Sequence, residues 1–313
     1  MANTIPREAV EEFTRQINTI SESMRKKLVE QLMAIDINAP GAKDVVIELM
    51  QTYCRASTDA AALVTAQFYD ATRAYIIGEE MGAVANSQRV ADATRIATVC
   101  IIDKSSTWAS TVAQLAGRLD YETKRASGDC MFYNGSRDQR KPHYARVPTG
   151  SETCMFCLML ASRGFVYRSA KSAGELDHYH ANCDCRVVAG WGDDPQVAGY
   201  DTKKLYGQWQ ASMDSMAKDR AERNGTSVAE ERSAIYRQLS DSAKKTRQRS
   251  RSADSESALM TSFRSEIASA TKDTNFAAAE ANISRMQSQG HITGGQAQSL
   301  RAAISDKKKQ LGI

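Results

Sequence analysis

The chain has 313 residues, of which 42% are hydrophobic, 7% aromatic and 25% charged, with a formal net charge of +4. This length allows two domains or one domain with extensions, and the small net charge does not by itself demand a nucleic-acid partner. No signal peptide and no apolar run of about 18 residues is visible, so we expect a protein of the reducing cytoplasm, outside the membrane.

Apolar residues recur at three- and four-residue spacing through the first part of the chain, which predicts amphipathic helices with core-facing stripes. We expect one helix over residues 7–33 and a second over residues 42–55. A third helix should begin after an N-cap at residues 57–59. Helices are expected to resume from about 84 to 126.

The composition changes at about residue 128, where Gly, Pro, Asn and Asp become frequent. Such residues favour turns, so we expect irregular or short-stranded structure there. Short strands are predicted at residues 144–148, 164–167 and 185–189.

The chain becomes polar and helical again after Trp191. Tyr206, Trp209, Met213 and Met216 keep helical spacing. Further helices are expected at about 256–271 and 275–289, and a last one should begin at Thr293.

These patterns predict a mainly α protein, in which long helical N-terminal and C-terminal arms flank a small α+β central unit clipped by zinc. Residues 1–127 would form the helical N-terminal domain and residues 128–195 the central unit. Residues 196–313 would form a helical, polar C-terminal region.

The zinc prediction rests on a 32-residue window that holds four of the seven cysteines and two of the four histidines. The candidates are Cys154, Cys157, His178, His180, Cys183 and Cys185. Thiolates and imidazoles are the ligands of tetrahedral zinc sites.

Cys154-x-x-Cys157 can supply two zinc ligands from one tight turn. Cys183 and Cys185 would point to the same face of an extended segment, which favours either four cysteines or three cysteines with His180. We expect the metal to be structural, because a small unit with a thin core gains folding energy from zinc.

Other interpretations of the cysteine window stay open. The cysteines could remain metal-free or form a disulfide, one could be a catalytic thiol, or a catalytic zinc could use Glu175 or Asp177 as a base. Outside the window, Cys54 and Cys100 lie in predicted helices and are expected to be small core residues.

The sequence ARVPTGSETCMFCLMLASRGFVY, followed by HANCDCRVV, resembles the Mu F-like minor head proteins of tailed bacteriophages, in the form found in phages of Gram-positive hosts. The shared elements are Val147-Pro148, the Cys154-x-x-Cys157 pair, the Leu-Ala-Ser-Arg-Gly turn at 160–164 and the closing His180-x-x-Cys183-x-Cys185. Many relatives close with His-Pro-Asn-Cys-Arg-Cys; here Ala and Asp occupy the Pro and Arg positions, and both changes spare the candidate ligands. The resemblance covers about residues 140–192.

The resemblance implies a non-enzymatic minor component of a phage head, present in few copies at the portal vertex. It would act in procapsid assembly, head morphogenesis or DNA delivery, in the host cytoplasm during assembly and in the virion afterwards. Its expected partners are the portal protein and the major capsid or scaffolding proteins, with phage DNA as a further candidate. Neither a membrane nor a small-molecule substrate is implied.

Two other functions compete with this one. Asp177-His178 is similar to the first pair of an HNH-type metal-dependent nuclease site, although no later Asn and His follow at suitable spacing. A basic run could bind nucleic acid through phosphate contacts, although such a run is more commonly a solvated helix surface. The run consists of Lys244, Lys245, Arg247, Arg249 and Arg251.

Overall fold

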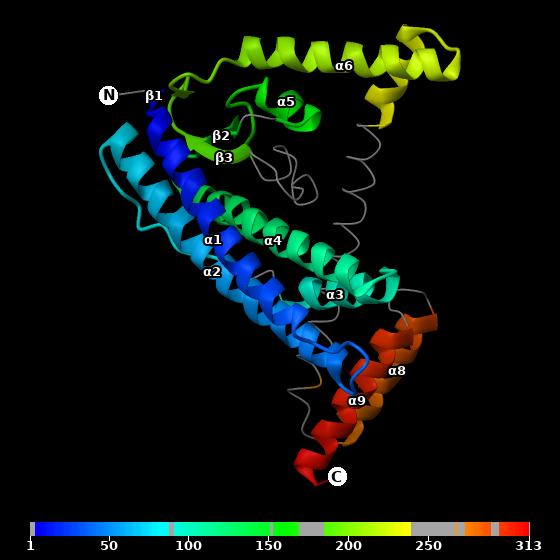
Figure 1. The fold of residues 1–313 in the computed structure, drawn as a ribbon. Helices are drawn as coiled ribbons and strands as arrows, with labels where there is room; N and C mark the ends of the chain where they lie inside the picture. The colour runs from blue at the N-terminus through cyan, green and yellow to red at the C-terminus, as the bar shows by residue number, and fades with distance from the viewer. Residues whose placement is uncertain are drawn as a thin grey trace. The chain divides into compact units, whose positions relative to one another are not determined.

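The computed structural model describes residues 4–87, 91–150, 153–168, 185–238, 267, 273–288 and 294–312 (Figure 1). The chain is mainly helical, as predicted. It divides into two compact units, Met1–Arg237 and Gln238–Ile313. The finer division into three regions stays a prediction.

Three long helices pack on one another to form the framework of the first unit (Figure 1). They are α1 (Arg7–Met33), α2 (Ala42–Ile77) and α4 (Trp108–Arg137), and the shorter α3 (Ala91–Lys104) packs on α2 and α4. The predicted helix over residues 7–33 is confirmed.

The prediction of two helices within residues 42–75 is wrong, because α2 is one helix of 36 residues. Ser57 and Thr58 do not cap a helix. Their hydroxyls instead donate to carbonyls of the preceding turn, Ser57 Oγ to Cys54 O (3.2 Å) and Thr58 Oγ1 to Arg55 O (3.1 Å). This back-bonding satisfies both hydroxyls inside a continuous helix.

The predicted change to irregular structure at residue 128 is also wrong, since α4 continues to Arg137. The glycine-containing segment stays helical because tertiary packing uses its small residues. A Cβ atom on Gly135 would overlap the hydroxyl oxygen of Tyr144 and lie only 2.8 Å from its Cζ, so only glycine admits this ring against the helix. Asn134 also binds Val84 through both ends of its amide, accepting from N at 2.8 Å and donating to O at 3.0 Å.

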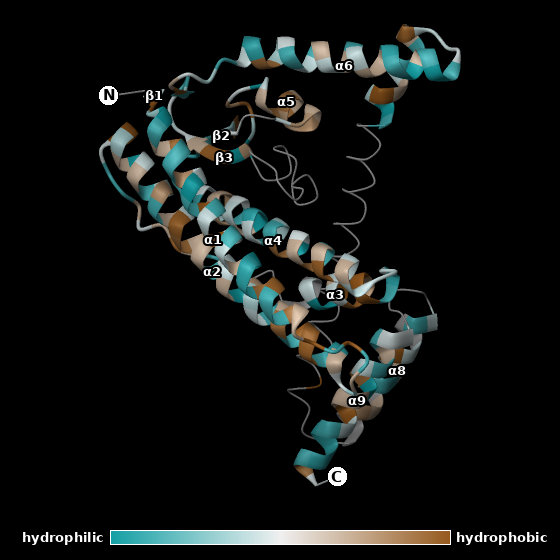
Figure 2. Cartoon of the chain, viewed as in Figure 1, coloured by the Kyte–Doolittle hydropathy of each residue, from teal (hydrophilic) through white to brown (hydrophobic). Residues whose placement is uncertain are grey.

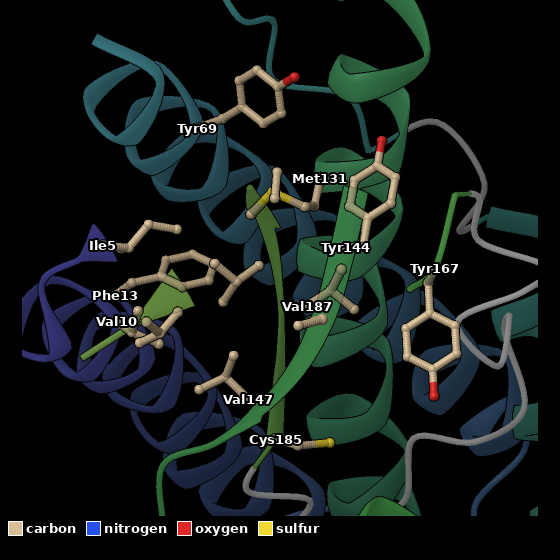
Figure 3. Packing of buried hydrophobic residues seen from close by; sticks show 14 of the residues in the cluster. Ile5, Val10, Phe13, Tyr69, Met131, Tyr144, Val147, Tyr167, Cys185 and Val187 are labelled. Atoms are coloured by element: carbon tan, nitrogen blue, oxygen red, sulfur yellow. The ribbon is translucent and has the colours of Figure 1, made fainter. Parts of the chain in front are cut away.

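Two apolar clusters lie at different levels of the helical framework. One joins α1, α2 and α4 through Leu28, Leu32, Val46, Met50, Cys54, Val112, Leu115 and Leu119. The other joins the helices to the small strands, and Figure 3 shows Phe13 and Val10 of α1 packed towards Val147 and Val187.

Buried hydroxyl pairs connect the helices in the middle of this framework. Ser57 Oγ lies 2.9 Å from Thr123 Oγ1, and Thr65 Oγ1 lies 2.9 Å from Ser127 Oγ. Buried polar groups cost free energy unless they are hydrogen-bonded. These pairs therefore favour a single register of α2 against α4.

The small strands form two two-stranded sheets. Antiparallel β2 (His143–Pro148) and β3 (Cys185–Gly190) form the β2–β3 ribbon, with Pro148 opposite Cys185. Parallel β1 (Thr4–Ile5) and β4 (Gln196–Val197) form the other. The strands predicted at 144–148 and 185–189 are confirmed, whereas 164–167 contributes only a bridge from Tyr167 to Tyr144.

The helix α5 (Met155–Ala161) packs on β2 and on α6 (Thr202–Asn224). The helix predicted after Trp191 is confirmed as α6, although of its four spaced apolar residues only Met213 is buried. Most of that helix is hydrophilic (Figure 2). The described part of the first unit thus contains a small α+β element beside the helices.

The second unit contains α8 (Asp273–Ser288) and α9 (Gly294–Leu311), which agree with the last two predicted helices. They share a small core that includes Phe276, Ile283, Leu300 and Ile304. Apart from residue 267, the helix predicted over 256–271 lies outside the described residues. No described helix is long and apolar enough to span a membrane.

Candidate functional site

Three of the predicted ligands lie at the junction of α5 with the β2–β3 ribbon, and we call Cys154, Cys157 and Cys185 the sulfur cluster. Cys154 is the N-cap of α5, Cys157 lies in its first turn and Cys185 begins β3. The Sγ atoms of Cys157 and Cys185 are 3.0 Å apart. Folding therefore brings together two thiols that are 28 residues apart in sequence.

Cys154 belongs to the same turn as Cys157. Its Sγ accepts a hydrogen bond from the Cys157 N–H, with an N···S distance of 3.4 Å. Cys157 and Cys185 are fully buried, whereas Cys154 is partly exposed.

A positive charge lies next to this sulfur cluster. Arg146 of β2 is 1% exposed, and its Nη2 lies 4.0 Å from Cys157 Sγ. Arg146 pairs with Val187 and Pro148 pairs with Cys185 across the ribbon. Side chains two residues apart on a strand share a face, so Arg146 and Cys185 lie on one face of the ribbon.

Tyr200 holds the two sides of the sulfur cluster together. Its hydroxyl lies 3.3 Å from the carbonyl oxygen of Arg146 in β2, and it also bonds to the carbonyl of Ala161 at the end of α5. Burial raises the pKa of this phenol, so it stays a neutral donor over the ordinary pH range. The spacing between α5 and β2 is thereby fixed from outside the cysteine window.

The remaining ligand candidates, His178, His180 and Cys183, lie outside the described residues, as do Glu175 and Asp177. Within the described part of the chain, no group of three or more His, Cys, Asp or Glu side chains is placed to hold a metal ion. The remaining donors of a zinc site would therefore have to come from residues 169–184. The basic run from Lys244 to Arg251 also lies outside the described residues.

The cysteines outside the window differ in exposure. Cys54 and Cys130 are buried, and burial raises the pKa of Cys54 to about 12. The expectation that Cys100 is a core residue is wrong, because Cys100 is exposed. The buried side of α3 is marked by Thr94 and Thr98, and Cys100 points away from that side at about 100° per residue.

Sequence reasoning missed a buried carboxylate at Asp138, directly after α4. Its Oδ2 accepts hydrogen bonds from Tyr69 Oη (2.8 Å), Arg73 Nε (2.9 Å) and Trp191 Nε1 (2.9 Å), and its Oδ1 accepts one from Arg140 N (2.8 Å). Burial alone would raise the pKa of Asp138. The four hydrogen bonds outweigh burial and lower it.

Asp138 thus joins α2, the end of α4 and the segment after β3. An aspartate within the turn-rich sequence at 128–153 gives no signal of this role, because its three side-chain partners are 53 to 69 residues away. The carboxylate is saturated with donors, so it is suited to holding elements together rather than to proton transfer.

Comparison with known proteins places this architecture in a family. The family model described as VG15 protein matches residues 4–212, which is more than half of the chain. The chain belongs to the VG15 family. The matched region includes the helical framework, the sulfur cluster and Asp138, and it ends within α6.

Relatives of this VG15 chain are phage proteins. It is 37% identical to the Gene 15 protein of Mycobacterium phage D29, in a match covering 14% of this chain and 26% of the relative. It is 38% identical to the Gene 15 protein of Mycobacterium phage L5, over 23% of this chain and 27% of the relative. The matches thus span about a quarter of these curated relatives. No solved structure matches the chain.

Proposed function

We propose that this VG15 chain is a non-enzymatic minor head protein of a tailed phage, acting at the portal vertex in procapsid assembly, head morphogenesis or DNA delivery. The supporting observation is that the Mu F-like signature lies within the span matched by a family with phage relatives. The described elements of that signature also fold as one unit, because α5 and the β2–β3 ribbon meet at the sulfur cluster.

The proposed partners are the portal protein and the major capsid or scaffolding proteins. The test is to purify procapsids and virions from cells infected with the parent phage and from cells infected with a nonsense mutant of this gene. We expect the protein in few copies per particle, cross-linked to the portal, and malformed or empty heads in the mutant. Normal particles that lack the protein would reject the proposal.

A plasmid assay addresses the nuclease alternative. A head protein without enzymatic activity should not nick supercoiled plasmid when Mg²⁺, Mn²⁺ or Zn²⁺ is added. Metal-dependent nicking that His178→Ala abolishes would favour the HNH-type function instead.

Within this function we propose a structural zinc held by Cys154, Cys157 and Cys185. His180 or Cys183 would supply the remaining ligand. Zinc bound to sulfur at about 2.3 Å places neighbouring sulfurs roughly 3.8 Å apart, whereas a disulfide needs about 2.05 Å. The observed 3.0 Å between Cys157 and Cys185 lies between these values. The pair thus suits either state, and the buried guanidinium favours the thiolate–metal state.

Metal analysis of the purified full-length protein tests the zinc proposal. We expect about one zinc per chain, lost in Cys154→Ser and Cys185→Ser and retained in the matched control Cys100→Ser. Folded protein without metal would reject the proposal. A Cys157–Cys185 disulfide in zinc-free protein purified without reductant would also reject it.

A second candidate function, DNA contact by the second unit, is favoured by the distribution of charge. Residues 238–313 contain 12 Lys and Arg but 7 Asp and Glu, a net charge of +5, whereas residues 1–237 have a net charge of −1. Among the described residues of the second unit, Leu311 is the only exposed large hydrophobic side chain. Phosphate contacts need cations and polar donors rather than an apolar patch.

Salt-dependent binding to duplex DNA tests this candidate. Each lost phosphate contact should reduce the slope of log K against log salt by about 0.9, so Arg247→Gln with Arg249→Gln and Arg251→Gln should flatten it strongly. Lys203→Gln with Lys204→Gln in α6 is the control from the first unit. Equal slopes for the wild type and both variants would reject DNA as the partner. Competition by polyglutamate as strong as competition by DNA would also reject it.

A further inference from the structure

We infer that the outward side of α3 is the interface of a two-fold symmetric dimer of this chain. We call Ile96, Val99 and Asp103 the outer stripe of α3, and Arg95 and Cys100 lie at its two margins. This inference does not depend on the zinc site, on DNA contact or on a role in the phage head.

The first step is the reversed polarity of α3. The side that packs on α2 and α4 buries Thr94 and Thr98, both 0% exposed, and Thr98 Oγ1 donates to Thr94 O at 2.8 Å. The opposite side exposes Ile96 by 66% and Val99 by 38%. The usual polarity returns in the next turn, where Ile101 packs partly buried against an apolar cluster of the framework. A surface helix normally directs apolar residues inward and polar ones outward, so the reversed turns indicate that another surface covers the outer stripe.

The second step is the geometry of the outer stripe. At about 100° per residue, its three residues project within a narrow sector of the helix, and Arg95 and Cys100 project to opposite sides of that sector. All five side chains are exposed. The apolar pair and the two charges therefore face the same direction.

The third step identifies the occupant from the charges. Arg95 lies at the N-terminal end of the outer stripe and Asp103 at its C-terminal end. If two copies of α3 pack antiparallel about an axis at Val99, Arg95 of each copy lies level with Asp103 of the other. Such an arrangement pairs opposite charges twice, whereas parallel copies would bring like charges together. A two-fold axis makes the two contacts equivalent, and two-fold dimers are the commonest oligomers of soluble proteins.

Asp103 remains able to make this contact. Its Oδ1 lies 3.2 Å from Lys43 Nζ, but both side chains are more than half exposed, at 65% for Lys43 and 55% for Asp103. A carboxylate has room for several hydrogen bonds. It can therefore meet Arg95 of a second copy and keep Lys43.

The first experiment measures the dimer dissociation constant of the full-length protein by sedimentation equilibrium. Ile96→Asp and Val99→Asp each place a carboxylate in the apolar part of the outer stripe and should weaken the dimer by at least about 10-fold. The matched control is Leu63→Asp on α2, because Leu63 is 53% exposed and lies outside the outer stripe. It should leave the dimer unchanged. Far-UV circular dichroism checks that each variant is folded.

The second experiment exchanges the charges. Arg95→Asp or Asp103→Arg alone brings like charges together and should weaken the dimer, whereas the double variant restores opposite pairs and should recover most of the lost affinity. Recovery of this kind is expected only when the two residues meet across the interface.

The third experiment uses Cys100. Two antiparallel helices bring the same margin of each copy together, so Cys100 of one copy should lie close to Cys100 of the other. A short bis-maleimide should therefore link two chains, and both Cys100→Ser and Ile96→Asp should abolish the link.

Several results would overturn the inference. A wild type that stays monomeric at the highest soluble concentration would reject it, as would a dimer that Ile96→Asp and Val99→Asp leave intact. Failure of the double variant to recover affinity, or cross-linking that is equally strong in Cys100→Ser, would place the interface elsewhere. A monomeric wild type that binds purified portal through the outer stripe would assign this surface to that partner and reject the dimer.

Discussion

Tyr69 of α2 donates a hydrogen bond to the buried carboxylate of Asp138 at 2.8 Å, across 69 residues of sequence. Arg73, one turn further along α2, donates to the same carboxylate from Nε at 2.9 Å. The side chain of Asp138, which directly follows α4, therefore holds two successive turns of α2.

We expect Asp138→Asn to be strongly destabilising. The change removes the negative charge that Arg73 meets in the interior, where the side-chain exposures of the two residues are 6% for Arg73 and 0% for Asp138. Breaking a buried pair on one side costs about 3–5 kcal/mol. Urea unfolding followed by circular dichroism measures the effect. The control is Asp103→Asn, which breaks the exposed Lys43–Asp103 pair and should cost less than about 1 kcal/mol.

The same carboxylate should make stability depend on pH. The pKa of Asp138 is lowered in the folded protein, so its contribution is fully present above the unfolded pKa of about 3.9. It is lost as the pH falls through the lower folded value. Urea midpoints of the wild type should therefore fall on acidification more steeply than those of Asp138→Asn. Parallel curves for the two proteins would contradict this expectation.

Gly135→Ala should destabilise the protein although alanine favours helices. Its Cβ would overlap Tyr144 Oη and lie 2.8 Å from Tyr144 Cζ, and overpacking typically costs about 1–3 kcal/mol. At Gly207, inside α6, an added Cβ would meet no other atom within 4 Å. Gly207→Ala should instead stabilise α6 by about 0.5–1 kcal/mol. Thermal unfolding of the two variants should move in opposite directions.

Thiol reactivity should distinguish the isolated cysteines. Cys100 is exposed, whereas Cys54 is buried with its pKa raised to about 12. Thiolates are the reactive form, so Cys100→Ser should remove one fast-reacting thiol from native protein titrated with a disulfide reagent. Cys54→Ser should leave the fast phase unchanged and remove one thiol only after unfolding. A fast phase that survives Cys100→Ser intact would contradict the exposure of this residue.

The sequence predicted the elements whose signal is local. The apolar stripe of Val10, Phe13 and Ile17 gave the correct limits of α1, and the Cys154-x-x-Cys157 spacing located the turn before α5. Errors arose where distant partners decide the local structure. Ser57 resembles a cap in sequence, but it lies inside a continuous helix, where its hydroxyl accepts a hydrogen bond from Thr123 Oγ1 of α4. Gly135 resembles a loop residue in sequence, but it stays helical with the ring of Tyr144 packed against it.

The site was predictable to a similar extent. Residue types and spacing pointed to the cysteines, and the structure places the Sγ atoms of Cys157 and Cys185 3.0 Å apart. The metal that they would bind stays a prediction. The residue spacing did not predict that Arg146 and Asp138 are buried, because a buried charge is recognised only from the residues that surround it. Those surroundings come from β2, α2 and the segment after β3.

The unbroken course of α2 has a mechanical consequence. A helix of 36 residues is about 54 Å long at about 1.5 Å per residue. Its first half contributes Val46 and Met50 to one apolar cluster, and its second half contributes Tyr69 and Ile76 to the other. Because α2 has no break between its two halves, a displacement of the end that packs on α3 would tilt the whole helix. The end that binds Asp138 would then move as well, since no flexible segment lies between the two ends.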